Sequence, residues 1–397
     1  MKKFSFELIK KDKTTRARAG IIHTPHGDIE TPAFSVVGTK ASVKGLDETD
    51  LKNAGSQVVL ANTYHLYLRP GVDVIKKFGG LRKFMRWDGP MITDSGGYQV
   101  SFLWEPRPQS LHSSVGGQGG KVKIIEEGAI FRSHIDGSKH LLTPEKSMEI
   151  QSVLGADIIM ALDQPMGNRF TEKQNKGAFE RTLRWEERSY VHWKKLETNQ
   201  ALFGIIQGQT DKKLRTECLK FLLDMDFPGL AIGGEEIGVD PARTAASLDT
   251  IVDLLPDDKP LHALGLGGGP EGIFEAVARG VDIFDNSSVT RLARTGLLFI
   301  YPEDGGNKRN KFRVNIKNSK YKNNKKPISK ECSCHTCENY SAAYINLLLL
   351  NNESLGVRLA TIHNVQFINS LMYEIRKNVI SGRFNSLKKH WLGRLKY

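Results

Sequence analysis

The sequence predicts an α/β protein whose helices and strands form a TIM (β/α)8 barrel. From about residue 57 to residue 285 the chain repeats one pattern: a short apolar, β-branched run, a polar or glycine-rich turn, and a helical stretch. With one more strand near residue 35 the pattern yields about eight strands. A doubly wound open sheet usually has fewer strands and a recognisable nucleotide-binding turn, which the irregular glycines of GLGGGPEG do not supply.

The expected strands are the short apolar runs that precede each turn. They lie at 31–39, 57–62, 90–94, 157–163, 202–208, 229–234, 261–267 and 281–286. The expected helices between them show apolar residues three and four apart. They lie at 145–155, 210–225, 241–255 and 270–280.

The chain departs from this repeat between residues 101 and 140. The first half is rich in Pro, Ser and Gly and is typical of a loop. The second half predicts a β-hairpin with its turn at Asp136-Gly137, leading into a helix. We expect this segment to be an insertion over the mouth of the barrel.

Polar side chains and glycines stand where the expected strands end. They are Asn62, Asp94, Asp163, Gln207, Gly233, Gly234, Gly265 to Gly269, and Asp285. The carboxyl ends of TIM-barrel strands share one mouth, so these residues should line one pocket. Their donors and acceptors, with the ring of Tyr98, suit a flat heterocycle such as a purine. A single Asp after a strand is as readily a helix N-cap, but three carboxylates at one mouth should titrate together, with at least one raised pKa.

Three of the four cysteines fall within the stretch ECSCHTCE. Cys332, Cys334 and Cys337 can surround one Zn²⁺ ion, which prefers thiolate and imidazole ligands in a tetrahedron. A fourth ligand must come from elsewhere in the chain. The remaining cysteine, Cys218, lies in the middle of an expected helix and should be buried. So few cysteines, three of them with metal-ligand spacing, favour a reducing compartment.

The charge of the chain favours a polyanionic partner. Its 397 residues carry a net charge of +13, and nine Lys or Arg with no acid lie between Lys308 and Lys326. This run is either a solvated linker or a surface that contacts phosphates, and its position beside the cysteines favours the surface. A membrane partner is not expected, because the chain has neither an apolar run of membrane-spanning length nor a signal peptide, and we expect a cytoplasmic protein.

Several longer motifs resemble those of the tRNA-guanine transglycosylase family, in the same order over nearly the whole chain. They are NTYHLYLRPG (62–71), TDSGGYQV (93–100), FRSHIDGSKHLLTPEKSMEIQ (131–151), GADIIMALD (155–163), FGIIQGQ (203–209), DIFDNSSVTRLARTG (282–296) and the cysteine cluster. The resemblance implies a TIM barrel with an inserted zinc-binding subdomain near the C-terminus. We expect a catalytic barrel over 1–300, and over 301–397 a basic zinc-binding subdomain with C-terminal helices that complete the barrel.

The resemblance also implies an activity. Members of this family exchange guanine at the wobble position of tRNA for a 7-deazaguanine precursor of queuosine, and bacterial members are commonly homodimers. Asp285 would be the nucleophile at ribose C1′, and Asp94 would be the general acid and base. The target base must first leave its stack.

Other residues take roles by the same resemblance. Those expected to bind the base are Asp163, Gln207, Gly234, Ser95, Asn62, Tyr98 and Leu264. Arg291 and Arg294 would hold the neighbouring anticodon nucleotides. His363, in TIHNVQF, would be the fourth ligand of one closed, structural Cys3His zinc site.

The chain departs from the family pattern around the pocket. Bacterial members often have Glu-Cys after the base-reading aspartate, where this chain has Gln164-Pro165, and Asn286 follows the expected nucleophile. Glu235 and Glu236 replace residues near the substituent of the deazaguanine. Their added negative charge favours a base with a cationic aminomethyl group, with the bulkier queuine as the alternative.

Two other functions stay open at this point. The chain could be a paralogue that inserts a deazaguanine into DNA, or a catalytically weak RNA-binding subunit of a heteromeric enzyme. Arg291, Arg294 and the cysteine cluster favour tRNA as the substrate. The presence of all three aspartates favours an active enzyme.

Overall fold

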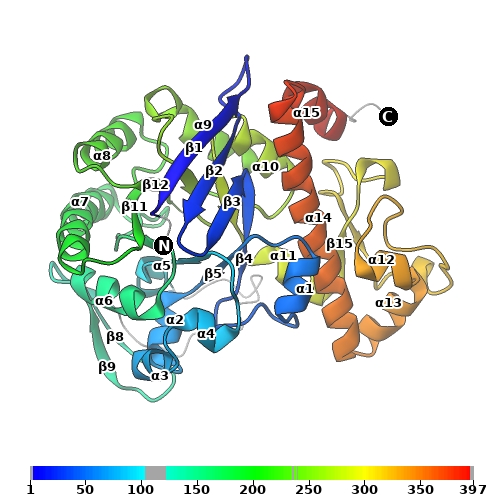
Figure 1. The fold of residues 1–397 in the computed structure, drawn as a ribbon, viewed down its shortest axis with the longest axis horizontal. Helices are drawn as coiled ribbons and strands as arrows, with labels where there is room; N and C mark the ends of the chain where they lie inside the picture. The colour runs from blue at the N-terminus through cyan, green and yellow to red at the C-terminus, as the bar shows by residue number, and fades with distance from the viewer. Residues whose placement is uncertain (1–2, 103–121, 235–236, 239, 394–397) are drawn as a thin grey trace.

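A computed structural model describes residues 3–102, 122–234, 237–238 and 240–393. Its centre is a closed barrel of eight parallel strands, in the order β4-β5-β6-β10-β11-β12-β13-β14, with β14 pairing back to β4. Helices surround the barrel (Figure 1). The predicted TIM barrel is confirmed.

Each barrel strand falls inside one of the eight runs expected from the sequence, except that β11 starts one residue earlier. The strands are β4 (Ala33–Val37), β5 (Val58–Ala61), β6 (Met91–Thr93), β10 (Ile158–Met160), β11 (Ala201–Ile206), β12 (Gly229–Ile232), β13 (Leu261–Ala263) and β14 (Ile283–Asp285). Nearly every residue in them is buried, because the barrel interior covers one face and the helices cover the other. This two-sided burial is the reason that the strands read as continuous apolar runs.

Helices follow the barrel strands, and several of them begin at a side-chain cap. The helices are α1 (Glu48–Asn53), α2 (Thr63–Leu68), α3 (Val72–Lys77), α4 (Leu81–Met85), α5 (Gly97–Phe102), α6 (Pro144–Leu154), α7 (Glu172–Lys195), α8 (Lys212–Asp224), α9 (Pro241–Asp249), α10 (Pro270–Val277) and α11 (Ser288–Thr295). The side chain of Thr143 caps α6 and that of Asp211 caps α8. The expected helix over 241–255 was too long: α9 ends at Asp249, and a 3₁₀ turn, η1 (Val252–Leu254), follows.

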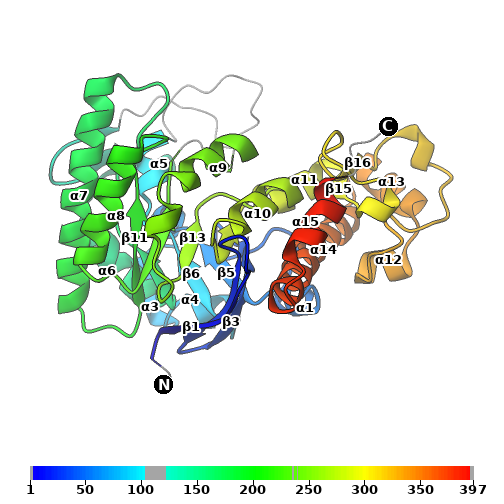
Figure 2. The same cartoon turned by 90° about the horizontal axis from the view of Figure 1, so that it is seen from above.

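A three-stranded antiparallel sheet, which was not predicted from the sequence, covers the N-terminal end of the barrel. Its strands are β1 (Ser5–Lys11), β2 (Arg18–Thr24) and β3 (Gly27–Thr31). Ile22 and Ile29 from this sheet pack into the barrel interior together with Phe203 and Ile283. Figure 2 shows β1 and β3 at the end of the barrel opposite α5 and α9. Among the described residues, this sheet closes the end of the barrel that lies opposite the carboxyl ends of its strands.

The insertion after α5 contains the predicted hairpin. β8 (Ala129–Arg132) pairs with β9 (Lys139–Leu142), and Asp136 and Gly137 lie in the turn between them. A third strand, β7 (Lys123–Ile124), extends this sheet. The loop expected before the hairpin falls largely on residues 103–121, outside the described residues.

The C-terminal part of the chain stands beside the barrel. It comprises β15 (Leu297–Phe299), η2 (Pro302–Asp304), β16 (Arg313–Asn315), η3 (Ser319–Tyr321), α12 (His335–Asn339), α13 (Ala342–Leu350), α14 (Ser354–Ile380) and α15 (Phe384–Leu392). The long helix α14 runs between the barrel and α12–α13 (Figure 1), and it contacts β4 and α11 on one side and α12 and α13 on the other. The basic run from Lys308 to Lys326 contains β16 and η3, so it is a folded segment. The domain boundary at residue 300 remains a prediction.

Within the described residues, no helix has both the length and the apolar character that crossing a membrane requires.

Candidate active site and metal centre

A cavity of about 1040 Å³ opens at the carboxyl ends of the barrel strands. It brings together ten of the residues singled out in the sequence. They are Asn62, Asp94, Ser95, Tyr98, Asp163, Gln207, Gly234, Leu264, Asp285 and Arg291. Arg294 does not line this cavity: its guanidinium turns back along α11 and donates from Nη1 to Thr290 Oγ1 at 3.1 Å.

Asp94 follows β6 and is held by the start of α2. Its Oδ1 accepts a hydrogen bond from the Thr63 backbone N–H at 2.8 Å, and its Oδ2 accepts one from the side-chain amide of Asn62. Burial, together with the nearby charge of Asp285, raises the pKa of Asp94 to about 7, although the Thr63 N–H opposes this shift. Asp94 is therefore poised to hold or release a proton near neutral pH.

Asp163 shares a hydrogen bond with the neighbouring strand end. Gln207 Nε2 donates to Asp163 Oδ2 at 2.7 Å, while Gln207 Oε1 is buried with no partner among the described residues. Burial raises the pKa of Asp163 to about 6. At least one raised pKa was expected from three clustered carboxylates. Burial is the main cause for both residues, and a neighbouring carboxylate, Asp285, adds to the shift only at Asp94. The pair offers a carboxyl group and a free amide oxygen to a ligand rich in N–H groups.

Asp285 ends β14, is buried, and lines the cavity. His262 Nε2 lies 2.9 Å from Asp285 Oδ1, and the Gly265 backbone N–H donates to the same oxygen at 3.1 Å. Gly265 has φ +73°, a conformation that glycine adopts without strain. The residue after the aspartate, Asn286, donates to Gly265 O at 2.5 Å, so it fixes this turn rather than the base.

Buried side chains behind the cavity hold the strand ends in place, a role that was not predicted from the sequence. Arg215, on α8, donates from Nη1 to Ile206 O at 3.1 Å and from Nη2 to Gly233 O at 3.0 Å. Cys218, on the same helix face, is buried as predicted. The sequence held one signal of this role: a charged residue, Arg215, lies on the apolar helix face that Cys218, Leu219 and Leu222 define.

The residues that depart from the family pattern do not all line the cavity. Pro165 lines it, but Gln164 turns away and its Oε1 accepts from Arg181 Nη1 at 2.6 Å. Glu235 and Glu236 are outside the described residues. Tyr98 and Leu264 both line the cavity, and their stacking on a base ring remains a prediction.

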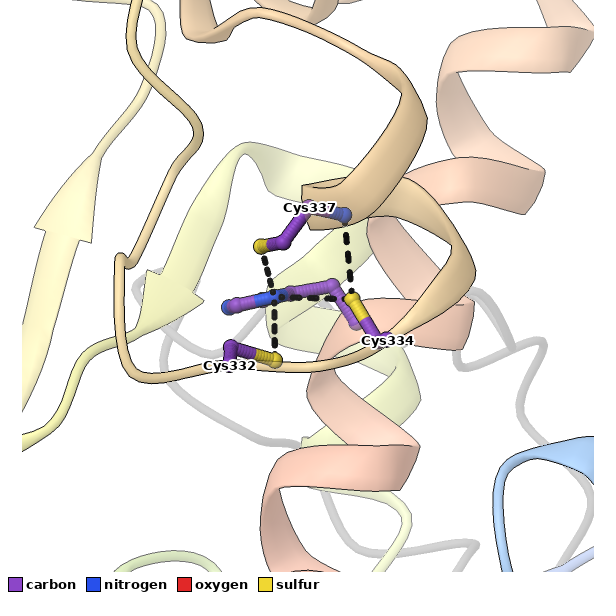
Figure 3. Close-up of side chains that lie close together, drawn as sticks. Cys332, Cys334 and Cys337 are labelled. Carbon is purple, nitrogen blue, oxygen red and sulfur yellow. Dashed lines mark hydrogen bonds between the residues drawn. The ribbon is translucent and has the colours of Figure 1, made fainter.

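The four predicted metal ligands come together between α12 and α14. The Sγ atoms of Cys332, Cys334 and Cys337 lie 3.6, 3.5 and 3.3 Å from His363 Nδ1, and all four side chains are buried. Figure 3 shows the three cysteines converging on one point. Typical Zn–S and Zn–N bond lengths in a tetrahedron place sulfur and nitrogen about 3.6 Å apart, so the cluster has room for one zinc ion.

A second contact orients the ligating histidine. His363 Nε2 lies 2.7 Å from the carbonyl oxygen of Phe299, to which it donates, so Nδ1 is left as the metal ligand. With four protein ligands and no open position, the site fits a structural ion. An ion here would tie α12 and the basic run to α14.

A closed barrel with three aspartates at its mouth and a buried Cys3His cluster beside it defines a class: TIM-barrel enzymes with an appended structural metal site. The family model described as queuine tRNA-ribosyltransferase matches residues 12–397. The queuine tRNA-ribosyltransferase of Desulforamulus reducens is 45% identical over 387 residues, which cover 97% of each chain. Those of Thermoanaerobacter pseudethanolicus and Bacillus velezensis are 44% and 43% identical, with 96% or more of each chain covered. The chain belongs to the queuine tRNA-ribosyltransferase family, which confirms the predicted family and enzyme class.

The raised pKa of Asp94 predicts a pH-dependent cost in stability. A carboxyl group whose pKa rises from 3.8 to about 7 on folding lowers the free energy of unfolding as the pH rises through this window. In Asp94→Asn this cost is absent. Between pH 5 and pH 8, Asp94 should lower the free energy of unfolding of the wild type by an amount on the order of 2–3 kcal/mol. We therefore expect the melting temperature of the variant, relative to that of the wild type, to be a few degrees higher at pH 8 than at pH 5. Asp163 is present in both proteins, so its contribution cancels, and an equal difference at both pH values would contradict the prediction.

Proposed function

We propose that this protein exchanges guanine at the anticodon wobble position of tRNA for a 7-deazaguanine base, through a covalent intermediate on Asp285. The observation that carries the proposal is the pairing of Asp94 and Asp285 at one barrel mouth. The charge of Asp285 helps to keep Asp94 protonated. One carboxylate is thus ready to attack and one carboxylic acid is ready to donate a proton.

In the first half of the reaction an Asp285 oxygen attacks C1′ of the target ribose. A C1′–O bond forms while the glycosidic C1′–N bond breaks, and the bonding electron pair goes to guanine. Asp94 donates its proton to the departing base. A pKa of about 7 suits this role, because the acid is substantially protonated at neutral pH and gives up its proton readily.

The second half reverses these steps with a new base. The incoming deazaguanine transfers its ring N–H proton to the Asp94 carboxylate, and its nitrogen attacks C1′. The C1′–O bond breaks and its electrons return to Asp285. Two displacements at C1′ give retention of configuration.

Base recognition would fall to the side chains between β10 and β12. Asp163 and the free Oε1 of Gln207 can accept from the N–H groups of a guanine-like edge, and Gly234 offers backbone groups. Ser95 and Asn62 line the same cavity beside Asp94. Tyr98 and Leu264 would hold the two faces of the ring.

The tRNA would lie across the basic side of the cavity. Arg169, Arg243, Arg291, Lys308, Lys311 and Arg313 all line its wall. Arg313 donates to Gly268 O at 2.6 Å and lies over the Phe299 ring, so the basic run is anchored at the wall of the cavity. We assign Arg291 to contacts with the anticodon, and Arg294 to the support of α11 through its hydrogen bond to Thr290.

We propose that Zn²⁺ occupies the Cys3His cluster, which would supply structure and not a reactive group. The cluster is separate from the cavity, because none of its four residues lines it. We also propose a homodimer that buries the exposed apolar residues Tyr344, Leu347 and Leu350 of α13. Light scattering in solution, where a monomer at all concentrations would contradict this, tests the dimer.

Exchange of radiolabelled guanine into nucleic acid tests the function. We expect incorporation into a tRNA that has guanine at the wobble position, and none into the same tRNA with adenine there. Incorporation into duplex DNA alone would identify a DNA-modifying paralogue. Absence of exchange with retained tRNA binding would identify a non-catalytic subunit.

The basic run should control binding and not chemistry. Each phosphate that a lysine or arginine neutralises contributes roughly 0.7 to 0.9 to the log-log slope of affinity against salt. Changing the exposed Lys311, Lys322 and Lys325 to Glu should reduce this slope and leave turnover at saturating tRNA nearly unchanged. In the matched control, the exposed Lys3, Lys10 and Lys13 of the N-terminal segment are changed to Glu. This reversal of charge should leave the slope unchanged. Equal slopes for both triple variants would contradict a tRNA contact by this run.

The choice of incoming base rests on Glu235 and Glu236. Their negative charge should favour an aminomethyl deazaguanine over queuine. In a competition between the two bases, Glu235→Ala should lose this preference, because the variant lacks the carboxylate that attracts the cation. A wild-type enzyme that uses only queuine would overturn the expectation.

A further inference from the structure

His262 is a fully buried histidine in the middle of β13, directly beside Asp285. β13 pairs with β14 through His262 and Ile283, and this pairing brings the imidazole alongside the carboxylate two residues further on. Nε2 of His262 and Oδ1 of Asp285 are 2.9 Å apart. A carboxylate can only accept, so the hydrogen of this bond belongs to Nε2.

Both hydrogen bonds that Asp285 accepts within the described residues reach the same oxygen. Oδ1 receives the His262 Nε2–H and the Gly265 N–H. Two donors at one oxygen fix the rotation of the carboxylate about the Cβ–Cγ bond. They leave Oδ2 without a donor among the described residues, in a side chain that lines the cavity.

The second nitrogen of His262 argues against a purely structural role. Nδ1 is buried and has no hydrogen-bond partner among the described residues. A buried polar atom without a partner typically costs about 1–3 kcal/mol. An aliphatic side chain would avoid this cost at a position surrounded by the barrel interior, so packing alone does not explain a histidine here.

Resting on the proposed function, we infer that His262 is the positioning residue of the nucleophile and that it selects Oδ2 as the attacking atom. The Oδ2–C1′ bond forms as the glycosidic bond breaks, and the electron pair of that bond leaves with the base, which takes a proton from Asp94. Oδ1 becomes the carbonyl oxygen of the intermediate and keeps both donors. When the second base attacks, Oδ2 leaves with its electrons, and the same two donors stabilise the carboxylate that re-forms.

Three substitutions at residue 262 separate this role from packing. His262→Leu removes the donor, His262→Gln can place an amide N–H near the position of Nε2, and His262→Asn can reach only the position of Nδ1. We expect the leucine and asparagine variants to lose roughly 10- to 100-fold in kcat, with the KM for tRNA unchanged, because the carboxylate can then rotate. The glutamine variant should recover most of the rate.

The melting temperature is the readout for structure. It should stay within a few degrees of wild type in the leucine variant, since the orphaned Nδ1 is removed together with the donor. A leucine variant that turns over like wild type would overturn the inference. A glutamine variant as slow as the asparagine variant, with equal melting temperatures, would also overturn it.

The rotamer of Asp285 gives a readout that does not depend on activity. A crystal structure of His262→Leu should show the carboxylate rotated away from Gly265, and an unchanged carboxylate would overturn the positioning role. The proposed function is judged separately, by guanine exchange in the wild-type enzyme. A failure of the positioning role of His262 can therefore be distinguished from a failure of the proposed base exchange.

Discussion

Asp285→Ala is expected to abolish base exchange while the fold is retained. The side chain lies at the end of β14 and borders the cavity, and it accepts only two hydrogen bonds within the described structure. Its removal therefore leaves few structural contacts unmade. Loss of the nucleophile removes the covalent route, which should reduce exchange by at least about 10⁴-fold.

Asp285→Asn should be as inactive as the alanine variant. The amide has the shape of the carboxylate but is a poor nucleophile. Only the wild-type enzyme should accumulate a covalent RNA adduct when the incoming base reacts slowly, and denaturing gel electrophoresis would detect it. The control is Asp257→Asn, which removes an exposed carboxylate paired with Lys11 and should exchange guanine at the wild-type rate.

Near-normal exchange by either Asp285 variant would remove this residue from the nucleophile role. Asp94 and Asp163 would then be the remaining aspartates that line the cavity. The pH profile of adduct formation adds an independent check. Because Asp94 must be protonated to release guanine, the rate of the first half-reaction should fall as the pH rises through about 7.

Loss of the metal ion is expected to have the largest effect on stability. Three thiols and an imidazole gathered in a buried space have little reason to stay together without a cation between them, since the thiolates repel one another. The binding free energy of a structural zinc ion is also folding free energy, on the order of 10 kcal/mol in small zinc domains. Cys334→Ser should therefore bind less than one ion per chain and melt at a much lower temperature, or be insoluble.

Cys218→Ser is the matched control for this experiment. Cys218 is also buried, but it lies on α8, where its Sγ accepts from the Gln207 N–H, far from the cluster in the chain. The variant should keep about one zinc ion per chain by elemental analysis. Wild-type protein purified without metal that melts no lower than the zinc-loaded form would contradict a structural site.

The barrel could be predicted from the sequence because each of its strands is buried on both faces. Runs such as VVLA in β5 and ALFGII in β11 have to be continuously apolar, and such runs are visible without a structure. The N-terminal sheet escaped prediction because β1 alternates partly buried and exposed residues and covers the barrel with one face only. The end of α9 escaped prediction because apolar residues continue past Asp249. Ile251 and Leu255, which flank the 3₁₀ turn, are buried, whereas Leu254 within the turn is exposed.

The candidate site also has features that could be predicted from the sequence and features that could not. By itself, the sequence determined which chemical groups are present: three aspartates and two amides at strand ends, a metal-binding set of cysteines, and an uneven positive charge. These groups follow from local patterns, since the carboxyl ends of parallel strands must meet at one mouth. Only the tertiary structure decided which atoms touch. His262 meets Asp285 across two strands, Arg215 reaches Ile206 and Gly233 from the outer helix layer, and Arg294 turns away from the cavity. Such contacts depend on register and side-chain direction at close packing, where a shift of one residue in a strand reverses the side that a side chain faces.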